Sequence, residues 1–253
     1  MTGTDPPSSH PRDPQERQLP RGLAFEGLVV RLRRGDGTPV VAIDDRVGPG
    51  EILTVMGPSG SGKSTLLAAV TGTLAPAFSM QGRIRLDGID VTAVPTHRRG
   101  IGLMMQDDVL FPHLSVGANL AFGLSSEIKG RAARSARVQA ALTAAGLEGL
   151  GDRDPATLSG GQRSRVALMR ALLAEPRALL LDEPFSKLDT GLRAQLRLFV
   201  FGQIRRAGLP ALLVTHDRED AAAAGGRVTS PVESTVTSTG TGSSPIGDGQ
   251  EGA

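Results

Sequence analysis

The sequence predicts an α/β fold with a parallel sheet, an antiparallel β subdomain on its N-terminal side and a helical insertion. Three observations carry this prediction. Four short runs of the chain are almost wholly apolar, a glycine-rich loop follows the first of them, and a helix-forming stretch separates the second from the third. The apolar runs are Ile52–Met56, 101–105, 178–181 and Ala211–Thr215. Strands that are apolar on both faces belong to a parallel sheet covered on both sides.

The N-terminal part has a different strand pattern. Residues 28–32 and 40–43 are β-like runs, and Gly35-Asp36-Gly37 lies between them. A turn of this composition between two such runs predicts an antiparallel hairpin. Residues 83–86 alternate polar and apolar side chains and end in Asp87-Gly88, so we expect a further half-exposed strand there.

The loop after the first apolar run fits the phosphate-binding pattern G-x-x-x-x-G-K-[ST]. Its glycines let successive backbone N–H groups turn inward toward phosphate oxygens. A helix is predicted over Lys63–Thr71, with Gly72 as its C-terminal stop, and its N-terminus adds partial positive charge to the anion site. The loop predicts a P-loop NTPase core. It consists of Gly57, Pro58, Ser59, Gly60, Ser61, Gly62, Lys63, Ser64 and Thr65.

The insertion is predicted over about 107–175. Helices are expected at 116–124, Arg131–Ala145 and 163–173, and a short one at 219–224. The ends of the chain are rich in polar residues, Pro, Gly, Ser and Thr, so we expect a disordered extension over 1–21 and a disordered tail over 228–253. A single domain over 22–227 remains.

Composition restricts the classes of function. No run of 18 apolar residues and no secretory signal is visible, so no direct membrane span is expected. The chain has no cysteine, which excludes disulfides and fits a cytosolic protein. A net charge of only +2, scattered arginines and the lack of Trp and Tyr argue against nucleic acid as a partner.

Chemically capable side chains follow three further apolar runs. Gln106, Asp182-Glu183 and His216 come at or just after the ends of these runs. Ligands of open α/β sheets bind at the carboxyl edge, so we expect these residues to meet the phosphate loop there. Asp182 can hold Mg²⁺ and Glu183 can polarise an attacking water. Taken alone, each is also compatible with a solvated strand end or a packed histidine.

Leu158-Ser159-Gly160-Gly161-Gln162 is the most specific motif. It places a serine N-cap and two glycines at the start of a helix, which forms a second anion site. With this motif and the order of the others, the stretch 23–220 resembles the nucleotide-binding subunits of ABC transporters. The resemblance implies ATP hydrolysis with ATP and Mg²⁺ bound by a nucleotide-sandwich homodimer.

The resemblance also implies roles for single residues. Lys63 and the rest of the loop grip the phosphates, while Ser64, Gln106 and Asp182 match the ligands of Mg²⁺. Glu183 matches the general base and His216 the switch histidine that senses the γ-phosphate. Residues 159–162, the signature, match the segment that closes over ATP of the opposite protomer. Residues 186–189 resemble the D-loop at the dimer interface and include Asp189.

The stretch 107–116 resembles that of bacterial importer ATPases for iron, thiamine, sulfate, molybdate or polyamines. From residues 154–158 and the short C-terminus we favour a thiamine-like branch. The resemblance implies membrane permease subunits, and through them a solute-binding protein, as partners. It places the chain at the cytoplasmic face of the inner (plasma) membrane, as a peripheral protein.

Three departures leave alternatives open. Leu32, Arg33 and Arg34 stand where the family usually has an aromatic residue for adenine, and Lys187 places a charge in the D-loop. Beyond His216 the family adds strands and helices, whereas this chain turns to Gly, Thr and Ser. The alternatives are a soluble ABC-type ATPase and a C-terminally altered relic that binds nucleotide with little turnover.

Overall fold

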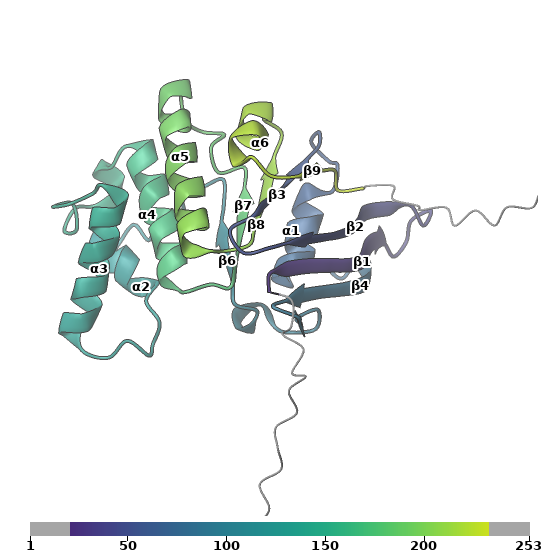
Figure 1. Ribbon diagram of the computed structural model, residues 1–253, viewed down its shortest axis with the longest axis horizontal. Coiled ribbons are helices and arrows are strands. Elements are labelled where there is room, and N and C mark those ends of the chain that lie inside the picture. The colour runs from purple at the N-terminus through teal and green to yellow at the C-terminus, as the bar shows by residue number, and fades with distance from the viewer. Residues whose placement is uncertain (1–20, 233–253) are drawn as a thin grey trace, which may run out of the picture.

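Two sheets and the helix between them position the rest of the chain (Figure 1). The computed structural model describes residues 21–232. The predicted extension at 1–21, apart from its last residue, and the tail from 233 onward lie outside the described residues.

The larger sheet is parallel, with strand order β6-β7-β8-β3-β9. Its three central members, β7, β8 and β3, are short and mostly buried, as their apolar sequences require, whereas β6 lies at one edge and is mostly half-buried. The sequence prediction of a parallel α/β core is confirmed. The strands are β3 (Ile52–Met56), β6 (Ile101–Met104), β7 (Ala178–Asp182), β8 (Ala211–Thr215) and β9 (Val228–Thr229).

The second sheet is antiparallel, in the order β2-β1-β4-β5. The predicted hairpin joins its first two strands, and the half-exposed strand predicted at 83–86 is the end of a longer one that pairs with β1. The N-terminal antiparallel subdomain is therefore confirmed. Its strands are β1 (Leu23–Leu32), β2 (Pro39–Val47), β4 (Phe78–Leu86) and β5 (Ile89–Asp90).

Helix α1 (Lys63–Thr71) lies between the two sheets and joins their cores (Figure 1). Its buried leucines pack in one cluster with residues of both sheets. Gly72 ends the helix in the left-handed conformation, as predicted, with φ of 80°. The buried Arg99 donates to the last carbonyl oxygens, 2.9 Å to Ala69 O and 2.7 Å to Val70 O. These contacts fix the helix that begins at the phosphate loop.

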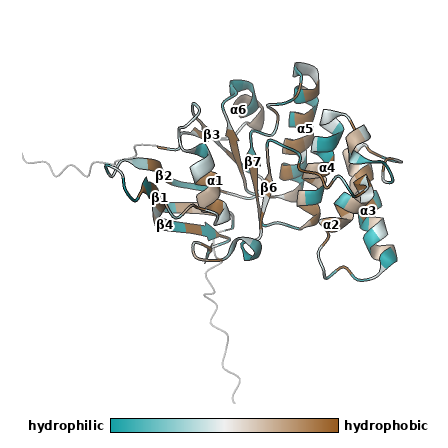
Figure 2. Cartoon of the chain, turned by 180° about the vertical axis from the view of Figure 1, so that it is seen from behind, coloured by the Kyte–Doolittle hydropathy of each residue, from teal (hydrophilic) through white to brown (hydrophobic). Residues whose placement is uncertain are grey.

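The predicted helical insertion is present and packs as a separate cluster (Figure 1). Its apolar side chains come mainly from three helices, and polar residues cover the outer side of α3 (Figure 2). In contrast, hydrophobic residues gather in the central strands of the parallel sheet (Figure 2). The helices are α2 (Val116–Phe122), α3 (Arg131–Ala145) and α4 (Gly160–Leu173). Two single 3₁₀ turns connect other elements, Thr96–Arg98 between β5 and β6 and Pro155–Thr157 between α3 and α4.

Helix α5 (Thr190–Ala207) was not predicted as an element, although it is 18 residues long. It covers one face of the parallel sheet together with α6 (Arg218–Ala224), which was expected at 219–224. Local signals for α5 exist. Asp189 caps its first turn by accepting from the amide of Leu192 at 3.0 Å, and Gly208 ends it with φ of 62°.

The ordered chain continues past residue 227, where a disordered tail was predicted to begin. Val228–Thr229 forms β9 and pairs with β3, and the amide of Ala42 donates to Pro231 O at 2.7 Å. The backbones approach so closely that a Cβ at Gly226 would lie 1.9 Å from Ile52 O. The sheet edge that seemed incomplete in sequence is therefore extended by this short strand.

Within residues 21–232, no helix combines the length and apolarity needed to cross a bilayer.

Candidate functional site

The carboxyl ends of four parallel strands meet at one edge of the larger sheet. Since β3, β6, β7 and β8 all run in the same direction, the residues that follow them emerge on the same side. The phosphate loop follows β3 and His216 follows β8. Asp182 and Glu183 end β7, and Gln106 lies just beyond β6. This is the edge at which the sequence analysis placed them.

The phosphate loop curls tightly over the start of α1. Gly62 has φ of 100°, and a Cβ there would lie 2.2 Å from Val40 O, so only glycine fits. Lys63 is buried, with only 8% of its surface exposed to solvent. Its ammonium donates to Gly57 O at 2.6 Å and Pro58 O at 2.8 Å, which folds the lysine back along the loop. The Ser61 hydroxyl is buried and has no hydrogen-bond partner in the described part of the chain.

A cavity of about 270 Å³ opens at this loop. The N-terminus of α1 faces it, and backbone amides and the helix dipole there favour an anion. Carboxylates of β7 complete the opposite wall. The cavity is lined by Val40, Ser59, Gly60, Gly62, Lys63, Ser64, Thr65, Asp182 and Glu183. The lining therefore includes hydroxyl and carboxylate oxygens, which are ligands of the kind Mg²⁺ prefers.

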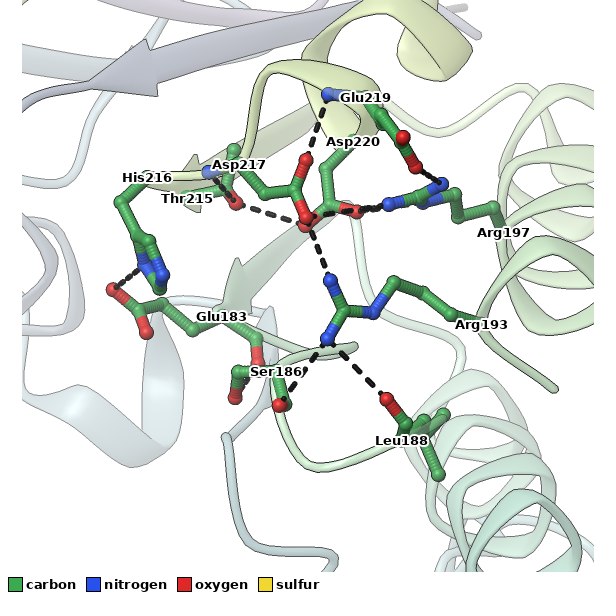
Figure 3. Close-up of polar contacts among 10 residues, drawn as sticks. All are labelled: Glu183, Ser186, Leu188, Arg193, Arg197, Thr215, His216, Asp217, Glu219 and Asp220. Atoms are coloured by element: carbon green, nitrogen blue, oxygen red, sulfur yellow. Dashed lines mark hydrogen bonds and ion pairs between the residues drawn. The ribbon is translucent and has the colours of Figure 1, made fainter. Parts of the chain in front are cut away.

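The two carboxylates of β7 have different surroundings. Burial raises the pKa of Asp182, the charge of Glu183 adds to the rise, and Lys63 opposes it. Glu183 has φ of 44°, a strained conformation for a residue with a side chain, and its amide donates to Val214 O at 2.9 Å. That turn points its carboxylate toward His216, whose Nδ1 lies 3.1 Å from Glu183 Oε1 (Figure 3).

His216 is 61% exposed at its side chain, whereas Glu183 is 22% exposed. The imidazole therefore lies at the open side of the site and can reach a bound group from solvent.

Gln106 lies outside the phosphate cavity. It borders a neighbouring cavity of about 480 Å³, together with Gly160 and Ser164 of α4. Lys187 lines the same cavity and forms an ion pair with Asp107. The charge that looked out of place in the sequence at Lys187 is thus balanced within the chain.

The signature residues also lie away from the phosphate cavity. Ser159 caps α4 by accepting from the amide of Gln162 at 3.3 Å, and Gln162 Oε1 accepts from the Ser159 amide at 3.0 Å. This reciprocal capping leaves the first turn of α4 preformed. Neither residues 159–162 nor Asp189 line the cavity of about 270 Å³.

Sequence reasoning missed a network of charged residues behind His216 (Figure 3). Arg193 and Arg197 lie one helical turn apart on α5 and face α6. Helix α6 begins two residues after His216. Asp217 pairs with both, at 2.7 Å and 3.5 Å. The i, i+4 spacing of the arginines was visible in the sequence, but their carboxylate partners were not.

The backbone on both sides of His216 is anchored by this network. Before it, the Thr215 hydroxyl donates to Asp220 Oδ2 at 2.8 Å. After it, the amide of Asp217 donates to the Thr215 hydroxyl at 3.0 Å. Asp217 also caps α6 by accepting from the amide of Glu219 at 2.7 Å. The backbone that carries the histidine is therefore held by the network, while its ring contacts Glu183 on the open side of the site.

We predict that Asp217→Asn destabilises the protein at neutral pH. Burial acts to raise the pKa of Asp217, but the Glu219 amide and the charges of Arg197 and Arg193 bring that pKa below its ordinary 3.8. A carboxyl with a lowered folded pKa stabilises the fold above 3.8, and this contribution is lost as the pH falls through the folded pKa. Asparagine still caps α6 but carries no charge.

Urea unfolding measured from neutral pH to below 3.8 tests this. The difference in the free energy of unfolding between wild type and variant should be largest at neutral pH and decrease as the pH falls. Asp154→Asn is the control, because Asp154 also accepts an amide two residues on, at 2.8 Å to Ala156 N, and has no arginine partner within residues 21–232. An equal pH dependence in both variants would contradict the assigned cause.

Comparisons with known proteins agree with this site. Residues 42–186 match the family model described as ABC transporter. Over 191 residues the chain is 49% identical to the "Uncharacterized ABC transporter ATP-binding protein YnjD" of Escherichia coli K12, which covers 76% of this chain and 88% of that protein.

Two further relatives are named as import proteins. The "Spermidine/putrescine import ATP-binding protein PotA" of Frankia alni is 47% identical over 74% of this chain and 40% of its own length. The "Fe(3+) ions import ATP-binding protein FbpC" of Streptomyces coelicolor is 46% identical over 83% of this chain and 59% of its own length. The chain thus spans about half the length of these two relatives. From the match of the family model and these identities, the chain belongs to the ABC transporter family of ATP-binding proteins.

Proposed function

We propose that the chain is the ATP-hydrolysing subunit of a bacterial ABC importer and energises solute uptake through separate membrane permease subunits. The observation that carries this is the sheet edge at which the phosphate loop, Asp182, Glu183 and His216 converge. The relatives named for import of iron and of spermidine/putrescine support the direction of transport.

ATP fits the phosphate cavity. The loop amides and the N-terminus of α1 favour its phosphates, and Lys63 would leave Gly57 O and Pro58 O to meet the β- and γ-phosphates. Ser64 and Asp182, which line this cavity, would hold Mg²⁺ there, and Gln106, which lines the other cavity in this structure, is proposed as a third ligand. When bound, the metal neutralises phosphate charge and orients the oxygens around phosphorus.

Glu183 is proposed as the general base. Its carboxylate lies on the wall of the cavity, within hydrogen-bond reach of His216, and would take a proton from the attacking water. His216 would donate to the γ-phosphate oxygen from the open side of the site. Lys63 would hold the developing charge from the loop side, so that the chain's own groups stabilise the reacting phosphoryl group from two directions.

The signature implies a second protomer. Because residues 159–162 and Asp189 do not line the cavity of their own chain, we propose that they close over ATP bound to the other copy. The preformed first turn of α4 would present its amides to the γ-phosphate. ATP would then hold a homodimer together, and hydrolysis would release it.

The proposed partners are permease subunits and, through them, a solute-binding protein, at the cytoplasmic face of the plasma membrane. No nucleic acid is proposed as a partner. The solute is not assigned, since the binding protein and permease would select it. The thiamine-like prediction gains no support from relatives named for iron and polyamines.

Affinity capture of the tagged chain from detergent-solubilised membranes tests the proposal. We expect an integral membrane permease in stoichiometric amount, identified by mass, and absent when the tag alone is used. Recovery without a membrane protein would contradict the importer function. Measurable ATPase activity would then point to a soluble ABC-type ATPase, and its absence to a relic that binds nucleotide.

A further inference from the structure

Arg193 connects the D-loop, which follows Glu183, with the segment that follows His216 (Figure 3). Its guanidinium donates to Asp217 Oδ2 at 2.7 Å through one terminal nitrogen. The other terminal nitrogen donates to two backbone carbonyls of the D-loop, Ser186 O at 3.4 Å and Leu188 O at 3.3 Å. One planar, rigid group thus joins the D-loop to the residue that follows His216.

The surroundings of Arg193 show that it is held in place. Its side chain is 24% exposed and that of Asp217 is 23% exposed, so the ion pair is mostly shielded from water. Arg193 Nε is fully buried and has no hydrogen-bond partner among residues 21–232. A buried donor without a partner is unfavourable, so the position of Arg193 is fixed by its other hydrogen bonds, which run to the D-loop and to Asp217.

The other arginines of α5 do not make this link. Arg197 also reaches Asp217, at 3.5 Å, but its other partners are the carboxylates of Asp220 at 2.6 Å and Glu219 at 3.0 Å, so it ties α5 to α6 without contacting the D-loop. Arg205 donates to Ala224 O at 2.6 Å, again between α5 and α6. Among the arginines of α5, Arg193 therefore combines contact with the carboxylate beside His216 and contact with residues 186–189.

We propose that Arg193 is a positioning residue that keeps the D-loop in register with His216. The D-loop begins three residues after Glu183, and the Ser186 hydroxyl donates to Glu183 O at 3.0 Å. A displacement of the D-loop by a second protomer would be passed through Arg193 and Asp217 to the backbone of His216. His216 and Glu183 would then move together into the positions required for ATP hydrolysis. This inference rests on the proposed ATPase function.

Arg193→Met, Arg193→Lys and Asp217→Asn, with the control Arg205→Met on the same helix, test the link. ATPase kinetics in Arg193→Met should show kcat lowered by roughly 10- to 100-fold with an unchanged KM for ATP, because the phosphate loop is not touched. Arg193→Lys keeps the charge but not the fork of donors and should recover part of kcat. Arg193→Met combined with Asp217→Asn should be no slower than the slower single variant.

Amide hydrogen exchange without nucleotide provides a readout independent of turnover. Arg193→Met should speed exchange in both 186–189 and 215–217, whereas Arg205→Met should leave both unchanged. A kcat for Arg193→Met equal to that of Arg205→Met, or faster exchange in only one of the two segments, would overturn the inference. If the wild type shows no ATPase activity, the proposed function fails instead, and the exchange data alone decide the link.

Discussion

Glu183→Gln is expected to retain ATP binding and lose nearly all turnover. Glutamine is close in size to glutamate and can still contact His216, but it cannot take a proton from water. Removing a general base lowers kcat by roughly 10²- to 10⁴-fold. Since nucleotide binding is retained and hydrolysis is blocked, the variant should accumulate as a dimer in MgATP, which size-exclusion chromatography with light scattering measures.

Glu51→Gln is the matched control for this substitution. Glu51 lies just before β3, at the opposite end of the strand from the site, and its carboxylate accepts from the amide of Gly48 at 2.8 Å. Glutamine preserves that acceptor, so turnover and dimerisation should match the wild type. Full turnover in Glu183→Gln would exclude Glu183 as the base.

The elements that position Glu183 were visible in the sequence because parallel strands carry a strong signal. β3, β7 and β8 are buried on both faces, so almost every residue in them is apolar. Polar residues directly after such runs then mark the carboxyl edge. This is why the sequence placed the phosphate loop, the carboxylates of β7 and His216 on one side of the sheet.

Helix α5 was harder to predict because its apolar and polar residues are not cleanly separated onto two faces. Leu198 on this helix is 79% exposed, while Arg197 is buried among carboxylates. A helix with an exposed leucine and a buried arginine does not follow the simple amphipathic pattern. Its caps, Asp189 and Gly208, were the better local signals.

β9 and the network behind His216 depend on contacts between distant parts of the chain. Val228–Thr229 lies among Gly, Thr and Ser, and its strand conformation comes from pairing with β3. Arg193 and Asp217 are separated by 24 positions in the chain and meet only because α5 and α6 pack together. Sequence pattern alone carries no signal for either.

Lys63→Met is expected to abolish ATP binding at ordinary concentrations. In the free protein the ammonium is held beside the cavity by Gly57 O and Pro58 O, and it would leave these carbonyls to meet the phosphates of ATP. Each charge-assisted hydrogen bond contributes about 1.5–3 kcal/mol, and losing two lowers the affinity by roughly a hundredfold or more. A fluorescent ATP analogue measures the loss directly, and the rise in melting temperature on adding ATP should disappear with it.

Lys63→Arg separates charge from shape in this prediction. Arginine keeps the positive charge, but a planar guanidinium does not fit a side-chain site that is only 8% exposed and bounded by two carbonyls. We therefore expect binding nearly as weak as in Lys63→Met. Lys129→Met removes the same charge from an exposed loop and should bind ATP like the wild type. Wild-type affinity in Lys63→Met would show that loop amides and the helix dipole hold the phosphates without the lysine, and strong binding in Lys63→Arg would show that charge alone suffices.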